Sequence, residues 1–162
     1  VYMLKLNFIV MGSLSEKHWQ DACDEYKKRL GADCKVTEWQ LKEQKLPRDP
    51  GEEQIAAALE KEAEQILSKI SPRSYTVALC VEGKSMDSPS LAARLAAVAT
   101  GGIGEINFIV GSSHGLSERV KRSADLRLSM SELTFPHQLA RVMLYECVYR
   151  CVQINKGTKY HK

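Results

Sequence analysis

Apolar residues along the chain form short dense runs, and these runs alternate with longer amphipathic stretches. The runs 75–81 and 106–111 are apolar on both faces, which is typical of strands buried within a parallel sheet. The other predicted strands cover residues 4–12, 34–41 and 125–131. Because helices are predicted between most of the strands, the pattern indicates one α/β domain with an open, mostly parallel sheet flanked by helices.

Helical spacing and end signals define the predicted helices. These cover residues 15–31, 52–70, 88–100, 117–124 and 136–155. Ser15 and Ser88 are the expected N-caps of the first and third helices, and Pro89 and Pro136 suit first helical positions. Residues 42–51 contain two prolines and are expected to form an exposed loop.

The helix predicted at 136–155 is apolar nearly all the way round. A surface helix needs only one apolar stripe, so we expect this helix to face the sheet on one side and a second subunit on the other. Burial within one large core would also explain the pattern, although a domain of this size has little room for it. Glu146 and Arg150 are spaced as a helical ion pair, and Cys147 and Cys151 are interpreted as small buried apolar residues.

Length and composition fit one domain over residues 3–162, with Val1 and Tyr2 before Met3 as expected leftovers of expression. The net charge of +3 permits an acidic partner such as nucleic acid without demanding one. Five cysteines without tight spacing favour reduced thiols in the cytoplasm. No apolar stretch reaches membrane length, and the start does not read as a secretory leader, so no membrane association is expected.

Common ligand motifs are absent from the sequence. Residues 78–85, ALCVEGKS, end like a phosphate-binding loop, but Ala78 replaces the first glycine and falls inside a predicted strand. A strand followed by a polar turn is the better interpretation. There is no G-x-G-x-x-G after the first strand, no H-E-x-x-H and no paired C-x-x-C, so no metal site is predicted.

Two loops between a strand and a helix are the most informative segments. VGSSHGLSE (110–118) and SMSELTFPH (129–137) each follow a strand, and ligands of open α/β sheets bind at the carboxyl ends of strands. The two loops are therefore expected to form opposite walls of one pocket, although simple connecting turns would look similar. His114 is a candidate site residue or a solvated loop histidine.

His137 and Arg141 lie one turn apart at the start of the last helix. The free amides of a helix N-terminus favour an anion, and two cationic donors reinforce that preference. A capped, solvated helix end is the alternative. We favour an anion or substrate site, because Arg141 is otherwise costly beside so apolar a surface.

Several segments together resemble the SPOUT-class methyltransferases that methylate N3 of pseudouridine in the large-subunit ribosomal RNA. The segments are LNFIVMG, EYKKRL, FIVGSSHGL, LTFPHQLARVMLYECVYR and the terminal YHK, and they span essentially the whole chain. The family carries Gly-Gly where this chain has Gly111-Ser112, and the small serine is expected to leave the pocket intact.

The resemblance implies a C-terminal trefoil knot, a homodimer formed through the knotted region and S-adenosylmethionine bound there in a bent conformation. The implied cofactor contacts are Leu79, Gly111, Met130, Ser131, Glu132, Leu133, Thr134 and Phe135. The implied substrate is a pseudouridine in a hairpin loop of 23S ribosomal RNA, presented by the large subunit or the whole ribosome, and no DNA partner is expected.

Methylation at N3 requires removal of the ring proton. Candidates for orienting the base or accepting that proton are His137, Arg141, Tyr160 and His161. For the terminal YHK, a frayed tail is the alternative. A non-catalytic RNA-binding domain that kept the knotted fold is the alternative function, and a nucleotide-binding oxidoreductase is a more distant one because the glycine fingerprint is missing.

Overall fold

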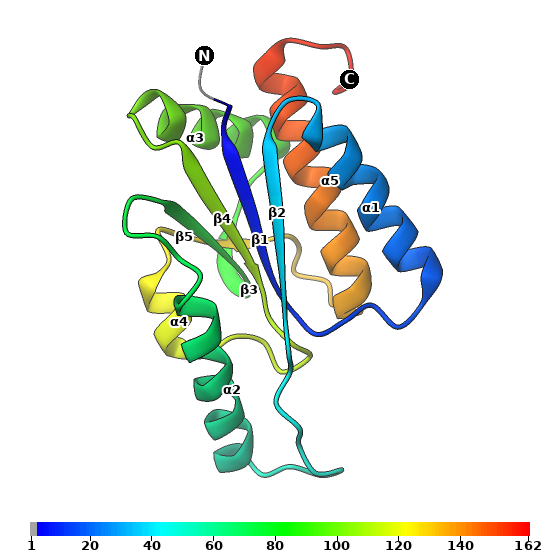
Figure 1. Cartoon of the computed structure of the whole chain (residues 1–162), viewed down its shortest axis with the longest axis vertical. Coiled ribbons are helices and arrows are strands. Elements are labelled where there is room, and N and C mark those ends of the chain that lie inside the picture. The colour runs from blue at the N-terminus through cyan, green and yellow to red at the C-terminus, as the bar shows by residue number, and fades with distance from the viewer. Residues whose placement is uncertain (1–2) are drawn as a thin grey trace.

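One five-stranded sheet forms the centre of the molecule (Figure 1). The computed structural model describes residues 3–162, so the expectation for Val1 and Tyr2 lies outside the described residues. The strands are β1 Lys5–Met11, β2 Lys35–Leu41, β3 Tyr75–Ser85, β4 Glu105–Val110 and β5 Leu126–Ser129. Their order is β2-β1-β4-β3-β5 and all neighbours are parallel, which confirms the predicted open α/β sheet.

Helices cover both faces of this sheet. They are α1 Lys17–Gly31, α2 Glu52–Leu67, α3 Ser88–Thr100, α4 Glu118–Ser123 and α5 His137–Lys156. Helix α5 packs against α1 and α3 on one face, and α2 and α4 lie together on the other (Figure 1). No helix among the described residues is long and apolar enough to cross a bilayer.

The alternation of side chains along β1 separates the two apolar cores. Phe8 points to the α1–α3–α5 side, where its ring packs against Phe108 and Tyr145 with centroids 5.4 Å and 4.1 Å away. Ile9 points to the opposite side and joins the core beneath α2 and α4. Both residues are fully buried, so β1 is covered on both faces.

Helix ends differ from the sequence prediction at several places, and Pro136 is the N-cap of α5 instead of its first helical residue. The N-cap of α1 is Glu16 instead of Ser15, and no side chain caps it. The N-cap of α3 is Asp87 instead of Ser88, because the carboxylate reaches the Ser90 amide at 2.8 Å. Helix α2 ends at Leu67, three residues before the predicted end.

Strand β3 is longer than predicted and leaves the sheet core early. Only residues 75–78 pair with β4, and the pairing with β5 shifts register between Leu79 and Lys84. Val81 is 72% exposed, so the expectation that the strand is buried as far as residue 81 is wrong. The strand no longer has a neighbour on the β4 side there, and its bulge turns toward the solvent.

Candidate active site

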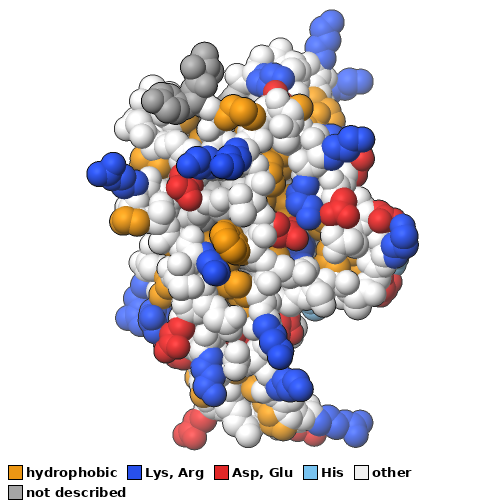
Figure 2. All heavy atoms as spheres, viewed as in Figure 1, with side chains coloured by type: hydrophobic (Ala, Val, Ile, Leu, Met, Phe, Trp, Pro, Cys, Tyr) orange, Lys and Arg blue, Asp and Glu red, His pale blue; other side chains and the backbone are white. Residues whose placement is uncertain are grey.

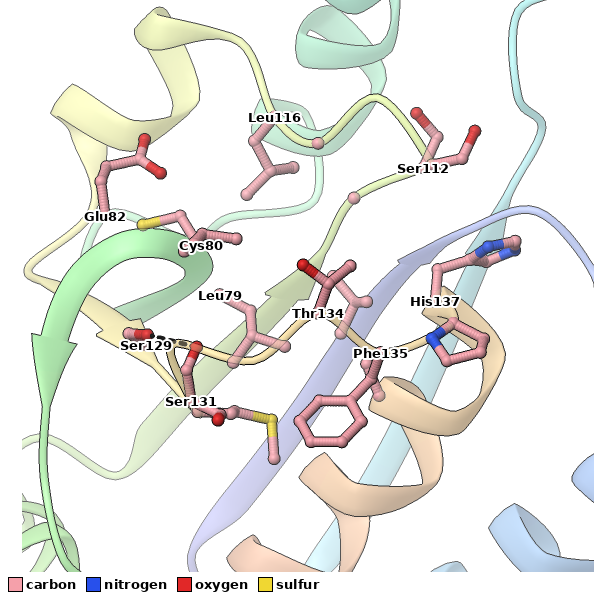
Figure 3. Close-up of a pocket in the computed structure, with 18 of the residues that line it drawn as sticks. Leu79, Cys80, Glu82, Ser112, Leu116, Ser129, Ser131, Thr134, Phe135 and His137 are labelled. Carbon is pink, nitrogen blue, oxygen red and sulfur yellow. Dashed lines mark hydrogen bonds between the residues drawn. The ribbon is translucent and has the colours of Figure 1, made fainter.

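A cavity of about 560 Å³ opens at the carboxyl ends of β3, β4 and β5, where the topology places ligands (Figure 3). Its walls are the β3 bulge, the loop after β4, the loop after β5 and the first two turns of α5. Seven of the eight proposed cofactor residues line it: Leu79, Gly111, Met130, Ser131, Leu133, Thr134 and Phe135. Glu132 is not among the lining residues and is exposed.

The loop after β5 forms one wall of the cavity, and two hydrogen bonds within the loop hold its shape. The Ser131 hydroxyl accepts a hydrogen bond from the Leu133 amide at 3.0 Å, and the Ser129 hydroxyl donates to the Ser131 carbonyl at 3.2 Å (Figure 3). This turn leaves the Leu133 side chain 71% exposed at the cavity. An exposed leucine at a cavity wall offers a packing surface to the flat face of a ligand.

The loop after β4 folds back tightly on Gly111. A side chain at Gly111 would place its Cβ 2.4 Å from the Gly115 carbonyl oxygen, well inside van der Waals contact. The Gly115 amide donates to the Ser112 carbonyl at 2.9 Å, and Gly115 has a φ of +84°, which favours glycine. The loop itself therefore requires glycine at 111, before any ligand is considered. His114 is exposed and lines the same cavity.

The β3 bulge supplies lining residues that the sequence analysis missed, namely Cys80, Val81 and Glu82. Gly83 makes the bulge possible, because a Cβ there would lie 2.8 Å from the backbone of β5. Lys121 on α4 pairs with the Glu82 carboxylate, and this contact lowers the pKa of Glu82. The polar residues EGKS (82–85) after an apolar run are the one signal in the sequence, and the turn that they predict is wrong because β3 runs through them to Ser85.

His137 and Arg141 do not share one environment. His137 lines the main cavity and also a neighbouring cavity of about 440 Å³ between the ends of β1 and β2. Arg141 is 1% exposed, and its Nη2 donates to the carbonyls of Met11 at 2.8 Å and Gly12 at 3.0 Å. In the single chain Arg141 faces the end of β1 and lines neither cavity, so its proposed contact with the substrate stays a prediction.

Arg141 is only partly paired in its buried position. Its Nε and Nη1 atoms have no hydrogen-bond partner within residues 3–162. The guanidinium lies close to Tyr145 and Cys23, whose pKa values it lowers against the larger effect of burial. Its bonds to the Met11 and Gly12 carbonyls instead hold the first turns of α5 at the carboxyl end of β1.

Tyr160 and His161 lie away from the cavity of their own chain and do not line it. The Tyr160 hydroxyl donates to Glu146 at 3.0 Å, and the Arg150 guanidinium stacks over the Tyr160 ring at 4.8 Å. Arg150 Nη1 lies 3.3 Å from His161 Nδ1. Glu146 and Arg150 form the predicted helical ion pair, with 2.6 Å between Glu146 Oε1 and Arg150 Nη2. Both residues also hold the C-terminal tail through these contacts.

The cavity fits an organic cofactor better than a metal. Its volume is within the range of small-molecule sites, and its lining combines apolar side chains with serine hydroxyls and the Glu82 carboxylate. Residues 3–162 contain no group of three or more His, Cys, Asp or Glu side chains placed to hold a metal ion. An open parallel sheet with this cavity defines a class of α/β protein whose ligands bind at the carboxyl edge of the sheet.

Comparison with known proteins narrows this class. A family model described as "Predicted SPOUT methyltransferase" matches residues 4–161. Proteins named "Ribosomal RNA large subunit methyltransferase H" from Streptococcus thermophilus and Clostridioides difficile are 41% and 39% identical over 159 residues, which is 98% of this chain and 100% of each relative. The chain belongs to the SPOUT methyltransferase family, and it is a methyltransferase.

Proposed function

We propose that residues 3–162 act as a single S-adenosylmethionine-dependent methyltransferase domain that methylates N3 of a pseudouridine in a hairpin loop of 23S ribosomal RNA. The names of the relatives support ribosomal RNA of the large subunit as the substrate class. The observation that carries the proposal is the cavity across the three strand ends, which gathers seven of the eight cofactor residues implied by the resemblance.

The cavities on either side of His137 suit a reaction between two ligands. The main cavity would hold the cofactor, and the neighbouring cavity of about 440 Å³ is lined by residues that include Ser13, Gln40 and Lys42. A donor in one and a base in the other would meet at His137. Positioning of the two reactants would then supply much of the rate enhancement.

Leu79, Leu133 and Phe135 would pack against the adenine, and the backbone groups of residues 130–135 would bond its edge. When bound, S-adenosylmethionine supplies an electrophilic methyl group. On the protein side, His137 is the only one of the four proposed catalytic residues that lines the cavity, so we assign to it the orientation of the base or the acceptance of the N3 proton.

The remaining three residues receive different roles. Burial and the hydrogen bond to Glu146 raise the pKa of Tyr160 to about 12, so at neutral pH its phenol donates a proton and does not accept one. Tyr160 and His161 would serve a cavity only after leaving Glu146 and Arg150, or in the cavity of a second subunit. Arg141 would act through the position of α5.

Association as a homodimer belongs to the same proposal. The outer face of α5 carries Met143, Cys147 and Ile154, which are partly exposed in the single chain. Basic side chains are scattered among acidic ones on the face in Figure 2, so this face offers RNA local contacts instead of one large basic patch. Action on ribosomes places the protein in the cytoplasm.

Two measurements test this function. Isothermal titration with S-adenosylhomocysteine should show binding to the wild-type protein. Single-turnover methyl transfer to ribosomes from a strain lacking the modification should then place the new methyl group on one pseudouridine by mass mapping. Absence of both cofactor binding and methyl transfer would reject the proposal and favour the alternative, a non-catalytic RNA-binding domain.

A further inference from the structure

Glu62 on α2 is a buried carboxylate outside the main cavity. It is 4% exposed, and its two oxygens accept hydrogen bonds from two different loops. Oε2 accepts from the Gln44 amide at 2.9 Å, and Oε1 accepts from the Ser112 hydroxyl at 3.1 Å. Glu62 therefore joins the loop after β2 to the loop after β4.

Ser112 connects this carboxylate to the cofactor site. Ser112 lines the main cavity. It also lines a smaller cavity of about 280 Å³, which Glu62 lines as well. Figure 3 shows Ser112 and His137 at the same end of the main cavity, with Cys80 and Glu82 at the other. The position of Ser112 thus sets the shape of the cavity near His137.

These two hydrogen bonds are the ones that the Glu62 carboxylate accepts within residues 3–162. Within residues 3–162, no Lys, Arg or His forms an ion pair with its carboxylate. A buried charge is costly when its donors are removed, so each neutral donor here contributes more than an exposed one would. Glycine, which the family resemblance leads one to expect at 112, has no hydroxyl to donate.

We propose that Glu62 is a positioning residue for the cofactor cavity, acting through the Ser112 hydroxyl to hold the loop after β4 in its binding conformation. This inference rests on the proposed function, because the ligand is taken to be S-adenosylmethionine. Gly111 and Gly115 make the loop compact, and the link to Glu62 fixes where the compact loop sits relative to α2.

The test uses the full chain and four variants. Ser112→Ala, Ser112→Gly and Glu62→Ala should each weaken the binding of S-adenosylhomocysteine about tenfold, as expected for the loss of a hydrogen bond to a charged group. Glu62→Gln should bind within about twofold of wild type, because its amide can accept from Gln44 and donate to Ser112. The KM for S-adenosylmethionine should rise in the first three, with kcat at saturation nearly unchanged.

Hydrogen exchange of the amides at 112–116 in the ligand-free protein provides a second readout. Exchange should accelerate in Ser112→Ala and stay slow in Glu62→Gln. The double variant Ser112→Ala with Glu62→Ala should bind no more weakly than the weaker single variant, since both remove the same contact. Glu64→Ala is the matched control: Glu64 is exposed on the same helix, and its side chain makes no hydrogen bond or ion pair within the described chain.

These outcomes distinguish the positioning role of Glu62 from the proposed function. Unchanged exchange and affinity in Ser112→Ala, or additive losses in the double variant, would overturn the positioning role. Binding that is weakened as much in Glu64→Ala as in Ser112→Ala would also overturn it. The effect would then not be specific to the hydrogen bond between Glu62 and Ser112. Failure of the wild-type protein to bind S-adenosylhomocysteine would reject the proposed function, and the exchange data would still decide whether Glu62 holds the loop.

Discussion

At the scale of single residues, Gly111 shows how a cavity can depend on contacts behind its wall. Its missing side chain leaves room for the Gly115 carbonyl, so the loop closes on itself before a ligand arrives. Leu116 also lies within 2.9 Å of the position that a Cβ would take. A substitution at 111 therefore acts on the loop first and on the cofactor second.

Gly111→Ala should lower the free energy of unfolding by about 1–3 kcal/mol, as overpacking does, and should weaken S-adenosylhomocysteine binding at least about tenfold. Urea unfolding and isothermal titration measure the two effects. Gly104→Ala is the control, because a Cβ at Gly104 meets no atom within 4 Å and the residue lies far from the cavity. Equal behaviour of the two variants would contradict the steric argument.

Cys80 is a natural reporter of the cavity. It is half-buried in the lining, and burial raises the pKa of its thiol above the ordinary value of 9.0. The thiolate is then a minor species at neutral pH, so alkylation by iodoacetamide should accelerate about tenfold per pH unit from pH 7 to 9. Peptide mapping should show protection of Cys80 by S-adenosylhomocysteine. Cys147, whose pKa is raised to about 11, should react more slowly and without protection.

At the scale of elements, Arg141 joins α5 to β1. Arg141→Ala removes both bonds to the carbonyls of Met11 and Gly12, and we expect the free energy of unfolding to fall by about 2–4 kcal/mol in urea titrations. Arg141→Met keeps the apolar stem and should recover part of the loss. Methyl transfer should fall together with stability, because His137 is carried by the same helix turns. Loss of transfer at unchanged stability would instead favour direct contact with the substrate.

Much of the fold could be predicted because burial leaves a regular trace in the sequence. The run 106–111 is apolar on both faces, and the structure places β4 in the sheet centre, between β1 and β3. The N-caps Glu16 and Asp87 could not be predicted, because the neighbouring Ser15 and Ser88 are also suitable N-cap residues. Which residue becomes the N-cap depends on the backbone geometry at the helix end, which the amino-acid sequence does not specify.

The candidate site was predictable to a similar degree. The loops after β4 and β5 follow from topology alone, since parallel strands end at one edge. The bulge at 80–83 did not follow, because Cys80 and Val81 continue an apolar run and the register shift depends on the approach of β5. The depth of Arg141 depends on the height at which α5 packs, which is a tertiary property.

At the scale of the whole molecule, the exposed face of α5 is the proposed subunit contact. Val148 is fully buried, so a charge there would disrupt the single chain. Cys147→Asp places the charge on the outer face instead and should convert dimers to monomers in light scattering, while circular dichroism stays unchanged. Lys28→Asp, an exposed change on α1, should leave the dimer intact. A monomeric wild-type protein would reject the homodimer. The trefoil knot stays a prediction.

The pairing of β1 with β4 also has a consequence for biosynthesis. Asn7 bonds Asn107 across these strands at 2.9 Å, one hundred residues along the chain, and α5, the last helix, covers Phe8 through Tyr145. A nascent chain therefore carries the buried strand β1 without its partner β4 until nearly all of the protein has left the exit tunnel. At ordinary translation speeds this interval lasts on the order of ten seconds. Folding must be largely post-translational, and a chain that stops short of α5 leaves β1 open to chaperones and to aggregation.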